Sequence, residues 1–243
     1  ISNIYYQFNS IFKASNGDVW FLPKHHTLPN NDFDKTPPIV KFDGLSWSVF
    51  HSSLGSFPNK GSVLCIDEDS QGNLWFGCSN GLVRLDNTGA FSTFDPPNVV
   101  YSNGQTMQAT NINSITIDVN DHIVMVSSQH KSVSGGGFFN WSCVRKYDPI
   151  ASTWADWHLS DAPWWNAVQV YYYPRYVVAM HDTANTVNVS TVGGGMYYIP
   201  SAQFGSKNRT QIANFLKYSN AGWGAWGWPM ENVYTNLPDF TER

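Results

Sequence analysis

One stretch of the chain, from Val63 to Phe94, constrains the fold more than any other. It contains four short apolar runs, VLCID, LWFGC, LVRLD and AFSTF, separated by the turn sequences SQGN, SNG and NTG. Because Gly and Asn at such positions favour tight hairpin turns, the stretch predicts four antiparallel strands in succession. A sheet of this size cannot bury its own apolar residues, so it needs neighbours that cover its faces.

The rest of the chain contains three imperfect copies of this unit, which is the pattern of a repeat protein. Upstream in the copies, Trp20 corresponds to Trp75, Val124 replaces the Trp in the third copy, and Pro174 lies at the turn of the fourth. The period of roughly 50 residues falls within the range of propeller blades. Each copy ends with an apolar strand, a turn and two large apolar residues three positions apart: Trp47 and Phe50, Phe91 and Phe94, Trp154 and Trp157, Ile212 and Phe215.

These repeats predict an all-β chain folded as a β-propeller of four-stranded antiparallel blades. The composition agrees, because aromatic residues make up 16% of the chain and charged residues only 13%. The four units can close a small ring or belong to a larger propeller, and the sequence leaves the number of blades open. The predicted blades cover residues 8–50, 63–94, 112–157 and 168–215, and residues 216–243 form a connection or a degenerate fifth blade.

Several classes of function are not favoured. A net charge of −4 without a basic run argues against a nucleic-acid partner, and no run of about twenty apolar residues predicts a membrane-spanning segment. The cysteines Cys65, Cys78 and Cys143 lack metal-ligand spacing, so we expect buried free thiols, no metal and no cofactor. Signatures of serine hydrolases, zinc proteases, P-loop proteins and dinucleotide-binding enzymes are missing. An enzyme is therefore not favoured, although a propeller lyase remains an alternative.

One acidic cluster, Asp67 to Asp69, lies at the first turn of the clearest unit. Asp118 and Asp121 occupy the equivalent turn of the third unit. Because both clusters fall at tight turns, where Asp side chains bond to nearby backbone groups, we interpret them as turn-stabilising.

The segment from Asp69 to Phe94 resembles the two-component regulator propeller repeat. The resemblance implies that the Trp fills space between blades and that Gly and Asn form turns. It also implies a bacterial extracytoplasmic protein, either a sensor region or a secretion-associated surface protein, in the periplasm, at the cell surface or secreted. The matching residues include Gly72, Asn73, Trp75, Gly81, Arg84 and Asp86, together with Trp20 in the first copy and Asp118, Arg145, Tyr147 and Asp148 in the third.

Long connections are expected on one face of the propeller, which we call the long-loop face. In a meander of four strands, the second-to-third connections and the inter-blade connections emerge together on one face. Loops that are free of core packing commonly carry function, so we expect the ligand to bind there. The long connections are residues 22–38, 128–142 and 182–195 within blades, and residues 51–62, 95–111 and 158–167 between blades.

Aromatic and His residues in or near these connections are the candidate ligand-binding residues. Exposed aromatic rings stack on sugar rings or peptides, and a His pair binds metal or titrates near neutral pH. Structural alternatives stay open, because the tryptophans can instead pack on a blade, Trp141 can enter a strand, and the His pair can be a plain loop pair. The candidates are Trp164, Trp165, Phe138, Phe139, His25, His26, Trp223 and Trp226.

The sequence therefore predicts a non-catalytic recognition propeller that binds a glycan, a peptide or a partner protein through its long-loop face. The alternative is a scaffold subunit of a surface or secretion complex, in which the same loops are buried against another protein.

Overall fold

The computed structural model describes residues 8–23, 38–100, 106–108, 110–133, 137–158, 177–181, 186–191 and 195–200. Within these residues the chain consists of strands and connections, and its one helical element is the 3-10 turn η1 (Ser52–Leu54). The strands are β1 (Phe8–Lys13), β2 (Val19–Pro23), β3 (Ile39–Phe42), β4 (Trp47–Phe50), β5 (Val63–Glu68), β6 (Leu74–Cys78), β7 (Gly81–Leu85), β8 (Phe91–Phe94), β9 (Val99–Val100), β10 (Thr106–Met107), β11 (Asn111–Ile117), β12 (Ile123–Val133), β13 (Gly137–Asp148), β14 (Thr153–His158), β15 (Val177–His181), β16 (Thr186–Thr191) and β17 (Gly195–Pro200).

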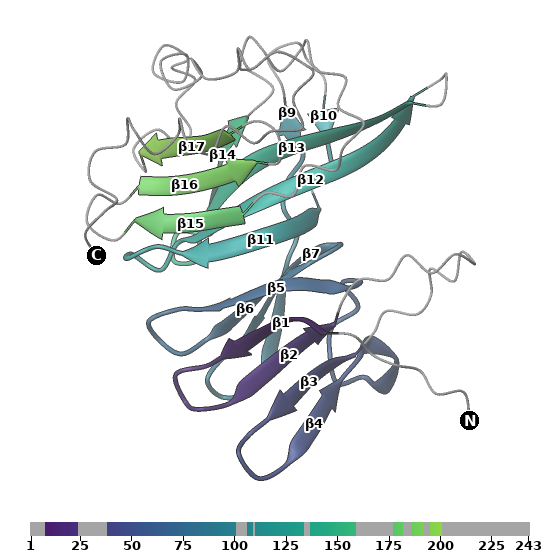
Figure 1. Ribbon diagram of the computed structural model, residues 1–243, viewed down its shortest axis with the longest axis vertical. Helices are drawn as coiled ribbons and strands as arrows, with labels where there is room; N and C mark the ends of the chain where they lie inside the picture. The colour runs from purple at the N-terminus through teal and green to yellow at the C-terminus, as the bar shows by residue number, and fades with distance from the viewer. Residues whose placement is uncertain are drawn as a thin grey trace.

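Each sheet is an antiparallel meander whose neighbouring strands follow one another along the chain (Figure 1). We call β1–β4 blade one, β5–β8 blade two and β11–β14 blade three, while β15–β17 form a fourth sheet. Successive sheets stack through their first strands: β5 lies against β1 and β2, β11 against β5 and β6, and β15 against β11. This arrangement is that of a β-propeller, as the repeats predicted.

Three segments that the sequence predicted as loops contain strands. β9 and β10 pair with each other inside the segment 95–111. β16 lies inside the segment 182–195 and pairs with both β15 and β17. β12 and β13 continue through most of the segment 128–142, as far as the pair Val133↔Gly137. The last two predictions were wrong because the apolar alternation by which a strand is recognised is short or missing there. It is limited to Val187 and Val189 in β16, and it is absent from SQHKSV at residues 128–133.

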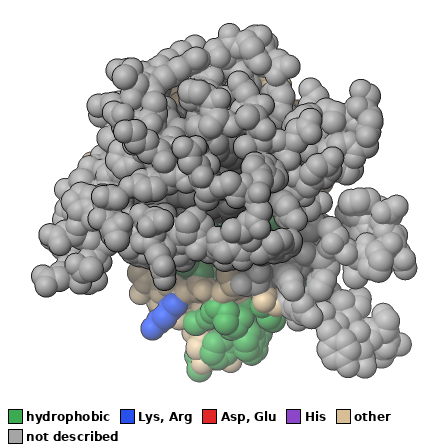
Figure 2. Space-filling view, turned by 45° about the horizontal axis from the view of Figure 1, so that its top comes forward, with side chains coloured by type: hydrophobic (Ala, Val, Ile, Leu, Met, Phe, Trp, Pro, Cys, Tyr) green, Lys and Arg blue, Asp and Glu red, His purple; other side chains and the backbone are tan. Residues whose placement is uncertain are grey.

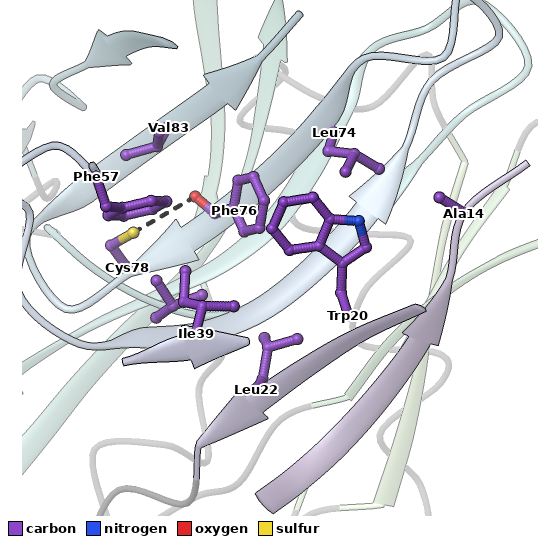
Figure 3. Close-up of a cluster of buried hydrophobic side chains, with 10 residues drawn as sticks. Ala14, Trp20, Leu22, Ile39, Phe57, Leu74, Phe76, Cys78 and Val83 are labelled. Carbon is purple, nitrogen blue, oxygen red and sulfur yellow. Dashed lines mark hydrogen bonds between the residues drawn. The ribbon is translucent and has the colours of Figure 1, made fainter. Parts of the chain in front are cut away.

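Two apolar layers join the first three blades. Trp20 faces blade two, with its ring 5.5 Å from that of Phe76, and Figure 3 shows these rings among the side chains of the first layer. Trp75 faces blade three in the same way, in a second layer with Ile115 and Met125. Both tryptophans are at most 1% exposed, so one large ring is buried between blades one and two and another between blades two and three.

Gly77 permits the close approach of blades two and three. A Cβ at this position would clash with Sγ of Cys65 and would lie 2.7 Å from Cγ2 of Ile112 on β11. Only glycine therefore leaves room for β11 to pack directly on β6.

Asp69 organises the turn between β5 and β6. Its Oδ1 accepts hydrogen bonds from the backbone N–H groups of Gln71 at 3.1 Å and Asn73 at 2.9 Å. Its Oδ2 accepts a hydrogen bond from Nε1 of the buried Trp75 at 2.8 Å. The amide Nδ2 of Asn73 donates to both carboxylate oxygens, at 3.0 and 2.9 Å. One carboxylate thus holds the turn and the inter-blade tryptophan together.

Blade one keeps the same backbone turn but lacks this carboxylate. The N–H of Ala14 donates to the carbonyl of Asp18 at 2.9 Å, just as the N–H of Asp69 donates to the carbonyl of Asn73 at 3.0 Å. Ala14 has no acceptor to offer, and Nε1 of Trp20 is buried without a hydrogen-bond partner. An unpartnered buried donor of this kind costs about 1–3 kcal/mol.

Blade three keeps the carboxylate and loses the tryptophan. The N–H of Asp118 donates to the carbonyl of His122 at 3.0 Å, which is the same turn again. Asp118 Oδ2 lies 2.9 Å from Nδ1 of His122, and Val124 takes the place of the tryptophan. The three blades therefore share one backbone turn, but the residue that begins the turn and its hydrogen-bond partner differ: Asp69 with Trp75, Ala14 with none, and Asp118 with His122.

Carboxylates at these turns also tie each blade to the next. Glu68 of blade two accepts from the N–H and the hydroxyl of Ser15 in blade one, at 2.7 and 2.6 Å. Asp121 of blade three accepts from the N–H of Ser70 in blade two at 2.8 Å and also from its hydroxyl. Asp121 has a φ of 61° at the turn position where blade two has Gly72, so an Asp in the left-handed region supplies this tie.

Candidate functional site

Most of the predicted ligand-binding residues lie outside the described part of the chain. This holds for His25, His26, Trp164, Trp165, Trp223 and Trp226. Phe138 and Phe139 lie on β13, where they pair across the hairpin with Ser132 and Lys131. Trp141 also lies on β13, so this aromatic segment is part of a strand and not a loop flap.

The hairpin of β12 and β13 extends well beyond the rest of blade three, and we call the pairs from Gln129↔Trp141 to Val133↔Gly137 the arm. The last pair that β11 makes with β12 is Asn111↔Ser128, and the last that β14 makes with β13 is Cys143↔His158. Among the described strands, no third strand covers either edge of the arm, which projects from the molecule in Figure 1. In blade two the same connection is the tight turn between β6 and β7.

The opposite face of the propeller carries carboxylates that are occupied by their own turns. The turns between third and fourth strands begin with Asp43, Asp86 and Asp148, whose Oδ1 atoms each accept two backbone N–H bonds. Hydrogen bonds lower the pKa of all three carboxyl groups. The largest cause is the Ser46 hydroxyl for Asp43, whose pKa falls to about 2, the Thr88 hydroxyl for Asp86, and the backbone N–H of Ala151 for Asp148. Within the described residues, no group of three His, Cys, Asp or Glu side chains could hold a metal ion.

The three cysteines are free thiols. Cys78 and Cys143 are buried, and desolvation raises the pKa of Cys78 to about 12 and also raises the pKa of Cys65 and Cys143. All three thiols therefore stay protonated at neutral pH, and they lack the thiolate character that a nucleophile requires.

Basic residues stack on the repeat tryptophans from the neighbouring strand. The guanidinium of Arg84 lies 5.7 Å from the ring centre of Trp75 and 5.9 Å from that of Phe94. Lys41 occupies the same place in blade one, 5.9 Å from the ring of Trp20. The shared geometry assigns these cations to blade packing through cation–π contact.

Arg145 breaks this pattern. Its guanidinium is fully buried, with Nε 2.6 Å from Oδ1 of Asp156 and Nη2 3.4 Å from Oδ2. It lies 5.2 Å from the ring of Trp154, while its Nη1 has no hydrogen-bond partner. Ser127, on the adjacent strand β12, is also fully buried and its hydroxyl is unpartnered.

The strand register corrects the alignment of Arg145 with the repeat, in which the sequence analysis had counted it as the basic residue that matches Arg84. Arg84 pairs with Trp75, and the residue that pairs with Val124 is Lys146. Arg145 pairs with Met125, so its equivalent in blade two is Val83. A shift of one residue along a strand moves a side chain to the other face of the sheet. The sequence Val144-Arg145-Lys146 contains two adjacent basic residues, so the sequence alone could not show which of them corresponds to Arg84.

Blade one exposes an apolar face on the side away from blade two. Ile11 is 66% and Trp47 is 61% exposed, and Phe21 packs between Phe8 and Trp47 with ring centres 5.4 Å from each. Figure 2 shows hydrophobic side chains gathered at the end of the molecule that blade one forms. In blade two the equivalent face, with Phe76, is buried against blade one.

Comparison with solved structures agrees with the propeller fold. PorZ of Porphyromonas gingivalis, a surface component of the type-IX secretion system, is 14% identical with a TM-score of 0.50; the match covers 85% of this chain and 27% of PorZ. YCF48 from Cyanidioschyzon merolae is also 14% identical with a TM-score of 0.50, over 84% of this chain and 57% of that one. The chain thus spans about a quarter of PorZ and over half of YCF48, and these likenesses show the fold alone.

A more distant likeness joins the chain to a domain described as the extracellular part of the hybrid two component system BT3049 from B. thetaiotaomicron. The identity is 12% and the TM-score 0.35, over 81% of this chain and 28% of that one, which is too low to carry an argument.

At the level of sequence, residues 56–80 match the family model of the two component regulator propeller. Blade two therefore carries a repeat of this family, as the motif around Trp75 predicted. No curated protein matches the sequence at a significant level. Among the described residues, no helix has the length and apolar content needed to cross a membrane.

Proposed function

We propose that this chain is a non-catalytic recognition propeller of a bacterial extracytoplasmic protein, and that it binds a peptide or a partner protein through its long-loop face. The observation that carries the proposal is the arm. It extends a connection that is a tight turn in blade two into a two-stranded ribbon, and a ribbon of this kind is only marginally stable in water unless something packs on it.

The arm suits a protein ligand better than a sugar. Each of its strands has an outer edge of backbone N–H and C=O groups that no described strand pairs with. An extended peptide can add to such an edge by main-chain hydrogen bonds, with nearby side chains supplying specificity. A glycan that stacks on the predicted aromatic residues Trp164 and Trp165 is the second possibility for the same face.

The extracytoplasmic location is part of the proposal. It is supported by the two component regulator repeat at residues 56–80 and by the likeness to a bacterial surface protein. Neither identifies the ligand.

A scaffold role is the second candidate function, and the exposed apolar face of blade one favours it. The equivalent face of blade two is covered by the Trp-bearing face of the preceding blade. We therefore expect the occupant of the blade-one face to be another propeller blade, presented by the assembled protein or by a partner subunit.

The proposal is tested by shortening the arm. A variant in which residues 129–141 are replaced by Asn-Gly joins Ser128 to Ser142 through a two-residue hairpin, which preserves all pairs of blade three from Ile123↔Tyr147 to Ser127↔Cys143. Binding to a peptide display library and to a glycan array is then measured for the wild type, the shortened variant and the Trp164→Ala/Trp165→Ala variant.

We expect the wild type to select peptides and the shortened variant to lose them with an unchanged melting temperature. Loss of glycan binding in the tryptophan variant alone would move recognition to the aromatic loop. Equal peptide binding by the wild type and the shortened variant would overturn the role of the arm.

A further inference from the structure

The Arg145–Asp156 pair stands where other blades have apolar or small neutral residues. Register places Arg145 and Asp156 opposite one another, and the equivalent pairs are Val83↔Thr93 in blade two and Val40↔Val49 in blade one. Replacing an apolar pair by a buried ion pair is often destabilising, because the free-energy cost of removing two charges from water can exceed the gain from their mutual attraction. The repeat shows that this position works without charge, so packing alone does not account for the pair.

The pair also leaves hydrogen-bond donors unused. Asp156 occupies Nε and Nη2 of the guanidinium, while Nη1 is buried without a partner. The hydroxyl of Ser127, fully buried, is likewise unpartnered. Ser127 pairs with Cys143 and Arg145 with Met125, so the two are diagonal neighbours on one face of blade three, with Cα atoms about 7–8 Å apart.

We propose that Arg145 Nη1 and the Ser127 hydroxyl form a binding site for a carboxylate group, between blades two and three at the base of the arm. The guanidinium offers an N–H donor and the hydroxyl an O–H donor to such a ligand, and a carboxylate is the acceptor that a guanidinium binds best. Asp156 holds the guanidinium in place from the other side, and Trp154 stacks on it.

The pair lies nearest to solvent at the outer strand of blade three, β14. The side chain of Asp156 is 21% exposed whereas that of Arg145 is fully buried, so the pair meets solvent on its Asp156 side. Trp154 on the same strand is also partly exposed. A carboxylate that enters along β14 would therefore pass Asp156 and Trp154 before it reaches the guanidinium.

This inference goes beyond the proposed peptide recognition and does not depend on it. A site of this kind would bind acetate, an acidic amino acid or a sugar acid through the same carboxylate, and the experiment separates these sources. The melting temperature of the full chain is measured against increasing sodium acetate, sodium glutamate and sodium glucuronate, with sodium chloride at matched ionic strength and neutral glucose as controls.

We expect acetate to raise the melting temperature in proportion to the logarithm of its concentration, as a ligand of the folded state does, while chloride and glucose do not. A stronger response to glutamate or to glucuronate would identify the larger ligand to which the carboxylate belongs. No response of the wild type to any of the three carboxylates would overturn the proposal.

Variants separate binding from folding. Arg145→Val/Asp156→Val restores apolar residues of the kind found at this position in blade one, so we expect it to fold at least as stably as the wild type and to lose the acetate response. Ser127→Ala keeps the pair and should require roughly tenfold more acetate for the same shift. Arg84→Lys, which copies the residue of blades one and three at its position, should respond as the wild type does.

The variant lacking residues 129–141 provides the last control. If it keeps the acetate response while losing peptides, the two sites are separate. An unchanged acetate response in the Arg145→Val/Asp156→Val variant would overturn the carboxylate site and leave the proposed peptide recognition unaffected.

Discussion

Trp20 and Trp75 occupy the same position in consecutive blades, yet only Trp75 has a hydrogen-bond acceptor for its Nε1–H. Both rings are buried between blades, and both are covered by a basic side chain from the adjacent strand. Trp75 donates its Nε1–H to Asp69, whereas Trp20 faces Ala14 and has no acceptor. The comparison shows that the ring is sufficient to join two blades, and that the carboxylate adds a link between this packing and the turn.

The largest expected effect is the loss of either ring. Trp75→Ala and Trp20→Ala should each lower the free energy of unfolding by about 3–5 kcal/mol, because a fully buried Trp leaves a large cavity. Trp75→Ala should cost more, since it also removes a donor from the largely buried Asp69 carboxylate. Urea denaturation of both variants measures the difference. Equal losses would show that the Asp69 bond contributes nothing beyond the ring.

Removing the carboxylate should come next. Asp69→Ala converts the turn of blade two into that of blade one and should cost on the order of 3 kcal/mol, because the hydrogen bonds to Gln71, Asn73 and Trp75 are lost together. A double-mutant cycle isolates the tryptophan bond. Trp75→Phe should cost more than Trp20→Phe in the wild type, and this difference should disappear in the Asp69→Ala background.

A smaller gain is expected when blade one is given the residues of blade two. Ala14→Asp offers Trp20 Nε1 an acceptor, but it places a second carboxylate beside Asp18, where blade two has the donor Asn73. Ala14→Asp/Asp18→Asn removes this repulsion, although it also removes the 3.0 Å ion pair of Asp18 with Lys41. We expect the double variant to gain about 1 kcal/mol in thermal unfolding and the single variant to gain less. A double variant less stable than the wild type would contradict this account.

The smallest effect concerns the turns that do not differ between blades. Asp43 caps the last turn of blade one as Asp86 does in blade two, and hydrogen bonds lower its pKa to about 2, that of the Ser46 hydroxyl being the largest cause. Because the folded pKa lies below the ordinary value of about 4, the stabilisation is present above pH 4 and is lost as the pH falls toward 2. A ¹³C NMR titration of the Asp43 carboxyl should therefore show a midpoint near 2.

Ser46→Ala should move the midpoint of Asp43 upward toward the ordinary value and leave that of Asp86 unchanged. An Asp43 midpoint that does not respond to this substitution would assign the shift to the backbone bonds of the turn.

Much of the fold was predictable because its signals are local. The turn sequences around Gly72 and Gly89 and the apolar runs between them indicated the strands of blade two, which the structure contains. β16 and the arm were missed for a physical reason. The alternation in β16 covers only Val187 and Val189 and is followed closely by three glycines, and residues 129–133 of the arm show none. Both are held by backbone pairing with neighbouring strands, which leaves little trace in their own sequences.

The candidate site was less predictable than the fold. Arg145 was assigned to the basic position of the repeat, whereas the register gives that position to Lys146 and places Arg145 on the opposite face. The sequence around Arg145 does not indicate that Asp156 is its ion-pair partner, because the two residues become neighbours only when β13 and β14 pair. Of the predicted ligand-binding residues, Phe138 and Phe139 lie on β13 and the others fall outside the described residues, and a role in binding remains a prediction for all of them.

The sequence by itself determined the repeat, the meander of short strands and the repeat tryptophans of blades one and two, because turn-forming residues and apolar alternation act over a few residues. Only the tertiary structure decided what each repeated residue touches. Trp20 and Trp75 are the same residue in the same pattern, and their difference comes from the side chain six positions earlier, which is Ala14 in one blade and Asp69 in the other. Likewise, the sequence shows that Arg145 is charged, but only the strand register and its burial show that the charge lies between two blades and not at the position of Arg84.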